Sequence, residues 1–135
     1  MEIAIILATL AVASFNAYAF VKAGLHKLRT TDAKLIESGW GWVKSAPKGS
    51  TKFIGLAEVL GGIGVIAAPV AVTVFNFDWA LPLGIAAGAG LATIMVLANL
   101  VHIVRKEIKY TWKSGVQLLL ATVLVTVLLS FYPIA

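Results

Sequence analysis

Four long apolar stretches restrict this chain to very few folds. They cover residues 3–28, 53–75, 81–104 and 115–132, and about 20 apolar residues are enough for a helix to cross the hydrocarbon core of a bilayer. Lipid offers the backbone no hydrogen-bond partners, so such a stretch crosses as a helix that satisfies its own N–H and C=O groups. The sequence therefore predicts an all-α integral membrane protein, a bundle of four helices.

The composition agrees with this prediction, because 60% of the residues are hydrophobic and only 13% are charged. Four spans and their connections use up the 135 residues, so we expect a single transmembrane domain over residues 1–135. The chain has no cysteine, which excludes thiol-based redox chemistry and cysteine-ligated metal centres. Its two histidines show no spacing typical of metal ligands, so we predict no metal site and no tightly bound cofactor.

The basic residues predict the orientation in the membrane. All of them lie in or beside the first and third connections. They are Lys22, Lys27, Arg29, Lys34, Lys44, Lys48, Lys52, Arg105, Lys106, Lys109 and Lys113. Because positive loops stay in the cytoplasm, we expect both connections to be cytoplasmic and both termini to be extracytoplasmic, in a prokaryotic plasma membrane. The net charge of +5 predicts binding to anionic lipid headgroups. It does not indicate nucleic acid, since the charge is divided between two membrane-proximal loops.

Glu58 is the most unusual residue of the apolar stretches. It lies six residues after Lys52, where an unpaired carboxylate in lipid costs several kcal/mol. Asn16 lies six residues before Lys22 in the first span, and Asn99 lies six residues before Arg105 in the third, so we expect the three side chains to share one layer. His102 follows Asn99 on the same helix face. Together they predict a polar pocket on the cytoplasmic side of the bundle.

Three uses of this pocket remain open. Glu58 can pair with Lys22 or with a protonated His102 and hold the helices in register. The pocket can instead bind the polar head of a quinone or a lipid, or it can relay protons. The candidate ligand-binding residues are Glu58, His102, Asn99, Asn16 and Lys22.

Small residues predict where helices approach one another closely, because a glycine face lets a neighbouring backbone come near. The candidate packing positions are Gly24, Gly55, Gly61, Gly62, Gly84 and Gly88. The last two form a GxxxG motif, which is also compatible with a partner helix. In the first connection, we interpret Trp40 and Trp42 as anchors at the membrane interface, with substrate binding as the alternative.

Two of these segments resemble motifs of the DoxX-like family of small membrane proteins. The run 20–28, FVKAGLHKL, is similar to the family's "aGl.Kl" signature, and the run 52–62, KFIGLAEVLGG, is similar to its "iG..E.lgg" signature. His102 with the basic residues after it resembles the end of the family's third span. The family positions matched here are Gly24, Lys27, Gly55, Glu58, Gly61, Gly62 and His102.

The resemblance implies a four-helix membrane protein that acts beside other proteins. Relatives include small subunits associated with thiosulfate:quinone oxidoreduction, a mycobacterial membrane oxidoreductase complex and assembly chaperones for receptors. It therefore implies a subunit accessory to a membrane oxidoreductase or respiratory system, with quinone or lipid as possible ligand, that does not catalyse alone. The alternatives are a non-enzymatic assembly or interaction subunit, partnered by other membrane subunits or by its own copies, and a proton-coupled carrier of a small solute.

Overall fold

The computed structural model describes residues 1–134, and this part of the chain is helical without any strand. In chain order, the helices are α1 (Glu2–Arg29), α2 (Asp32–Glu37), the 3-10 helix η1 (Gly41–Lys44), α3 (Ser50–Phe75), α4 (Ala80–Val104) and α5 (Ile108–Ser130). Within residues 1–134, four helices, α1, α3, α4 and α5, are long and apolar enough to cross a membrane. The predicted all-α fold with four spanning helices is therefore confirmed.

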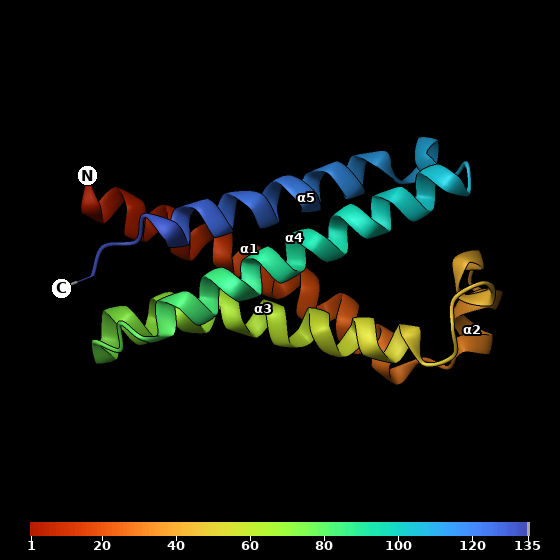
Figure 1. Cartoon of the computed structure of the whole chain (residues 1–135), viewed down its shortest axis with the longest axis horizontal. Coiled ribbons are helices and arrows are strands. Elements are labelled where there is room, and N and C mark those ends of the chain that lie inside the picture. Colours follow the sequence, from red (N-terminus) through yellow and green to blue (C-terminus); the bar gives the residue numbers. More distant parts are fainter. Residues whose placement is uncertain (135) are drawn as a thin grey trace.

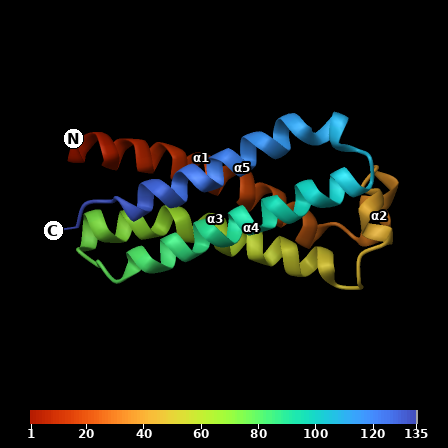
Figure 2. The same ribbon diagram turned by 45° about the horizontal axis from the view of Figure 1, so that its top comes forward.

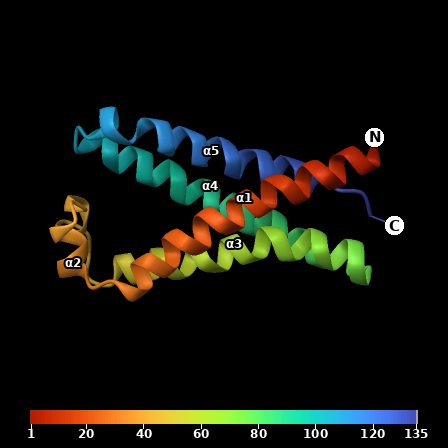
Figure 3. The same ribbon diagram turned by 180° about the vertical axis from the view of Figure 1, so that it is seen from behind.

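The long helices pack in the cyclic order α1, α3, α4, α5, and α5 closes back onto α1. Both termini lie at one end of the bundle, which we call the terminal end, and α2 lies at the opposite end, the α2 end (Figure 1). Figure 2 shows the same arrangement from another angle. In Figure 3, α1 runs diagonally, beside α5 near the N-terminus and beside α3 near the α2 end. The pairs α1/α3 and α4/α5 diverge towards the α2 end in Figures 1 and 3.

Local signals explain where the helices begin and end. Thr30 takes an extended conformation and ends α1, and the Thr31 hydroxyl then accepts a hydrogen bond from the backbone N–H of Lys34 to start α2. Asn76 ends α3 in the left-handed conformation, a common helix stop. Helix α5 starts at Ile108, seven residues before the apolar stretch that begins at Gly115, because its first two turns are polar and hydropathy does not register them.

The core is built from apolar side chains of all four long helices. It contains Ala13, Phe20, Val65, Leu91, Met95, Val125 and Leu129. Most other large apolar side chains, such as Leu60, Leu97 and Leu124, are exposed on the outside of the bundle. Outward-facing apolar residues of this kind suit a protein surrounded by lipid.

All six predicted packing glycines are buried, each against a neighbouring helix. The tightest approach of backbones joins α1 and α3, where a Cβ added to Gly24 would lie 2.5 Å from the carbonyl oxygen of Gly55. The GxxxG motif is used inside the bundle, since Gly84 lies against Ala68 of α3 and Gly88 against Thr126 of α5. A partner helix therefore does not reach this motif in the folded chain.

We predict that Gly24→Ala destabilises the protein by about 1–3 kcal/mol, because the new methyl group meets backbone atoms that move only with the helices. The matched control is Gly90→Ala in α4, where an added Cβ meets nothing within 4 Å. We expect the control to leave stability unchanged or slightly higher. Thermal unfolding in detergent micelles, followed by tryptophan fluorescence, measures both variants, and equal effects would contradict the packing described above.

Candidate functional site

A buried ion pair joins α1 to α3 near the α2 end. Lys27 Nζ donates a hydrogen bond to Glu58 Oε2 over 2.8 Å. The two side chains are only 10% and 7% exposed. Each charge is thus compensated by the other inside the bundle, as the position of Glu58 in an apolar stretch requires.

The local sequence explains why these two charges meet. Gly24 precedes Lys27 by three residues, and Gly55 precedes Glu58 by three, so on each helix the glycine and the charged residue share one face. The two glycines bring the backbones of α1 and α3 into contact. The ion pair lies directly beside this contact.

Lys52 ties the end of α1 to the start of α3. Its Nζ donates to the carbonyl oxygen of Lys27 over 2.6 Å and also to that of Thr30. The last carbonyls of a helix have no partner within the helix, and a lysine side chain can satisfy them. From the sequence, Lys52 served only to mark the membrane boundary, whereas in the structure it caps α1.

Trp40 lies over the ion pair on the side of the α2 end. Its ring centre is 5.3 Å from Lys27 Nζ, a distance typical of a cation–π contact, and 5.4 Å from the His26 ring. Trp42 packs obliquely on Trp40, with the ring centres 6.4 Å apart. Trp40 therefore covers the buried lysine, a role that the sequence did not indicate.

The predicted partners of Glu58 have other contacts. Lys22 is exposed, and its Nζ lies near the hydroxyl and over the ring of Tyr18. His102 Nδ1 lies 3.0 Å from Glu107 Oε2. Pairing of Glu58 with Lys22 or His102 was thus wrong, and the partner is Lys27. The reason is angular: five residues separate Lys22 from Lys27, which places their side chains roughly 140° apart around the helix.

Asn16 and Asn99 lie at other helix contacts. Asn16 Nδ2 donates to the carbonyl oxygen of Ala121, linking α1 to α5, and Asn99 Nδ2 donates to that of Gly115, linking α4 to α5. Both amides also bond to their own helix, at the carbonyls four residues before. The Asn16 Oδ1 atom is buried without a hydrogen-bond partner.

The expected single layer of Asn16, Glu58 and Asn99 is not formed. Gly62 packs against the Ala17 carbonyl, which places Asn16 roughly 8 Å from Glu58 along the bundle axis, towards the terminal end. Gly61 packs against Leu91, which places Asn99 roughly 8 Å from Glu58 in the other direction. The number of residues to the nearest basic residue did not predict the position along the bundle axis, because the helices extend beyond the apolar stretches by different lengths.

A second ionic group lies between α4 and α5 at the α2 end. Glu107 accepts a hydrogen bond from Arg105 Nε over 2.9 Å and is also bonded to His102. These hydrogen bonds hold the pKa of Glu107 below its ordinary value, with His102 contributing most. Arg105 Nη1 also donates to Ser45 Oγ over 3.4 Å, so the group reaches the segment that holds η1.

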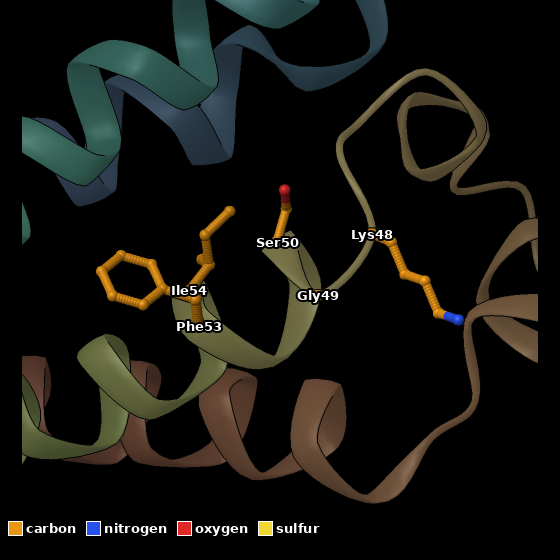
Figure 4. A pocket seen from close by; sticks show the side chains of 5 residues that line it. All are labelled: Lys48, Gly49, Ser50, Phe53 and Ile54. Atoms are coloured by element: carbon orange, nitrogen blue, oxygen red, sulfur yellow. The ribbon is translucent and has the colours of Figure 1, made fainter.

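Two open hollows mark the bundle surface. One, of about 500 Å³, lies between α3 and α4 and is lined by Ala57, Leu60, Gly61, Leu83, Ala87, Gly90, Leu91, Thr93 and Ile94. The other, of about 410 Å³, lies at the start of α3. Figure 4 shows that Ser50 and Ile54 point to the same side there, whereas Lys48 points away from them. None of the predicted ligand-binding residues lines either hollow.

Sequence reasoning missed three contributors to this end of the bundle: Lys52 as a cap, Trp40 as a cover and Arg105 as a contact to the first connection. From the sequence, Lys27 was named only among the basic residues in or beside the first connection and among the positions matched to the family, not as the partner of Glu58. Its position three residues after Gly24, matched by Glu58 three residues after Gly55, was a signal in the sequence that could have identified the pair.

The fold and the site define a small integral membrane protein built as a bundle of four helices, with a lysine–glutamate pair buried between the first and second spans. A model of the DoxX-like family matches residues 6–128. The chain belongs to this family. Comparison with curated proteins and with solved structures finds no match.

We predict that Lys27→Met or Glu58→Gln alone destabilises the protein by about 3–5 kcal/mol, because each leaves a buried charge without its partner. The double variant is expected to recover most of this loss, since neither charge remains. Lys22→Met is the control, as Lys22 is exposed and separate from the pair. Unfolding in detergent micelles measures all four proteins. Additive losses in the double variant would contradict a direct pairing.

Proposed function

We propose that this protein is a non-catalytic accessory subunit of a larger membrane complex. The observation that carries the proposal is the use of its intramembrane polar side chains. Lys27 and Glu58 join α1 to α3, Asn16 joins α1 to α5, and Asn99 joins α4 to α5. These groups serve contacts within the chain and do not converge on a common substrate position.

We propose that the α2 end faces the cytoplasm of a prokaryotic cell. The connections at this end and the helix ends beside them carry exposed basic side chains, among them Arg29, Lys34, Lys48, Lys106 and Lys109. Positive loops are retained in the cytoplasm, where they attract anionic lipid headgroups. Both termini are then extracytoplasmic.

For the partner, we propose a subunit of a membrane oxidoreductase or respiratory system, in line with the relatives that the family resemblance implies. Self-association of this chain is the alternative. The large apolar side chains exposed around the bundle supply the surface that either contact needs within the membrane.

We predict that a tagged copy, cross-linked in native membranes before extraction, co-purifies with one dominant partner protein. Cross-linking first is necessary because detergent replaces lipid and can separate helices that only van der Waals contacts join. Mass spectrometry identifies the partner, and an unrelated tagged membrane protein of similar length is the control. Recovery of only free, monodisperse chain would contradict the proposal.

A second candidate function is the binding of a quinone or lipid headgroup at the ion pair. The observation in its favour is the aromatic ring of Trp40 over Lys27, which places an aromatic surface beside a hydrogen-bonding ammonium and carboxylate near the α2 end. Such a combination suits a polar ring on an apolar tail.

If this candidate holds, Glu58→Gln weakens the binding of a soluble quinone analogue to the purified protein. The His102→Ala variant shows whether binding depends on the Lys27–Glu58 pair or on the group of His102, Arg105 and Glu107. The structure ties His102 to Glu107, so we expect His102→Ala to have a smaller effect than Glu58→Gln. Lys22→Met is again the control. Binding that is unchanged in the folded Glu58→Gln variant excludes this candidate.

A further inference from the structure

The first connection contains a small folded unit at the α2 end, residues 31–48, which we call the cover segment. Its two short helices, α2 and η1, pack against each other. Each contributes a buried side chain, Leu35 and Val43, and the backbone N–H of Trp40 donates to the carbonyl oxygen of Leu35 over 3.0 Å. These contacts hold the cover segment together as one body.

Few contacts attach the cover segment to the bundle. On one side, the Trp40 ring lies over Lys27 and contacts the His26 ring at a centroid distance of 5.4 Å. On the other side, Arg105 Nη1 donates to Ser45 Oγ over 3.4 Å, and the guanidinium lies so close to Gly41 that an added Cβ would be 2.5 Å from Nη2. Among the described residues, the bond from Arg105 to Ser45 is the only hydrogen bond between the cover segment and residues 80–134.

The Arg105 arm is itself held in place. Its Nε donates to Glu107 Oε1 over 2.9 Å, and the other oxygen of Glu107 is bonded to His102. The arm therefore extends from the end of α4 to a segment that lies beside the divergent end of the bundle (Figures 1 and 3).

The cover segment joins α3 through a turn in which the backbone N–H and the hydroxyl of Ser50 both donate to the Pro47 carbonyl, so pivoting there requires these two bonds to open. Gly49, directly before α3, has a φ of 89°, and an added Cβ would meet nothing within 4 Å there. A glycine in open space changes its backbone angles at little cost.

We propose that the cover segment is a movable lid over the Lys27–Glu58 pair and that Arg105 is the latch that holds it closed. In the closed state, Trp40 covers Lys27. In the open state, Trp40 leaves with the rest of the cover segment, and the ion pair becomes accessible from the α2 end. This inference concerns the chain alone and does not depend on either proposed function.

The latch is weak, so the closed and open states can be in equilibrium. The bond to Ser45 is long, and Arg105 and Ser45 are exposed to solvent. A partly exposed hydrogen bond of this kind contributes little net free energy, so the open state is a minor but populated one.

The test measures how fast Lys27 is acetylated by a water-soluble N-hydroxysuccinimide ester, with peptide mass spectrometry of the full chain in detergent micelles. Lys48, which is exposed, reports general reactivity in the same sample. Arg105→Gln removes the latch, and we expect acetylation of Lys27 to become about two- to tenfold faster, as the loss of one hydrogen bond predicts. The matched control is Lys109→Gln, which removes an exposed positive charge near the same end without touching the lid.

A second arm closes the lid instead of opening it. The chain has no cysteine, so Ser45→Cys with Arg105→Cys creates its only two thiols, which a short bismaleimide can join. We expect acetylation of Lys27 to be slower after cross-linking than before, with Lys48 unchanged. If Arg105→Gln fails to fold, as its circular dichroism would show, this arm decides alone. Equal rates for Lys27 before and after cross-linking, or in folded Arg105→Gln and the unaltered chain, would overturn the lid.

Discussion

The contact between α1 and α3 is the constraint on which the rest of the bundle depends. The glycine pair Gly24 and Gly55 brings the backbones together, and the close approach places Lys27 against Glu58. The desolvation of two charges offsets much of their attraction, so the pair contributes less to stability than to register. A slip of one helical turn would move the charges about 5.4 Å apart and leave both unpaired in an apolar environment. The pair therefore fixes how far α1 and α3 are shifted along each other.

Contacts between the other pairs of helices complete the cyclic packing that begins with α1 and α3. The hydrophobic effect does not drive helices together inside lipid, so association rests on close packing and on hydrogen bonds between helices. Gly61 against Leu91 and Gly84 against Ala68 join α3 to α4, and Gly88 against Thr126 joins α4 to α5. Asn16 then closes the ring from α1 to the carbonyl of Ala121. Each junction uses a small residue or an amide where two particular helices cross, which explains why the polar side chains are spread along the bundle.

The spanning helices could be predicted from the sequence because length and hydropathy depend on local composition alone. The need of Glu58 for a partner was equally predictable, because the cost of burying a charge does not depend on the fold. Its partner was predicted wrongly because only the distance to the nearest basic residue was considered, which favours Lys22. The direction around the helix decides the pairing, and Lys27 shares the face of Gly24 as Glu58 shares that of Gly55. The roles of Trp40 and Arg105 depend on contacts between residues far apart in the chain, such as Arg105 with Ser45, and no local pattern reports these.

The α2 end combines a firmly held pair with a loosely held cover, and the combination has a physical consequence. Lys27 and Glu58 are fixed by backbone contact, whereas the cover segment is attached by Trp40, which contacts Lys27 and His26, and by Arg105, which contacts Gly41 and Ser45. A ligand or partner shifts an equilibrium only through different affinities for its two states. A partner that supplies a carboxylate to Arg105 competes with Ser45 for the guanidinium, and a carboxylate binds it more strongly than a neutral hydroxyl does. An acidic surface at the α2 end would thus favour the open state without altering the register that the ion pair sets.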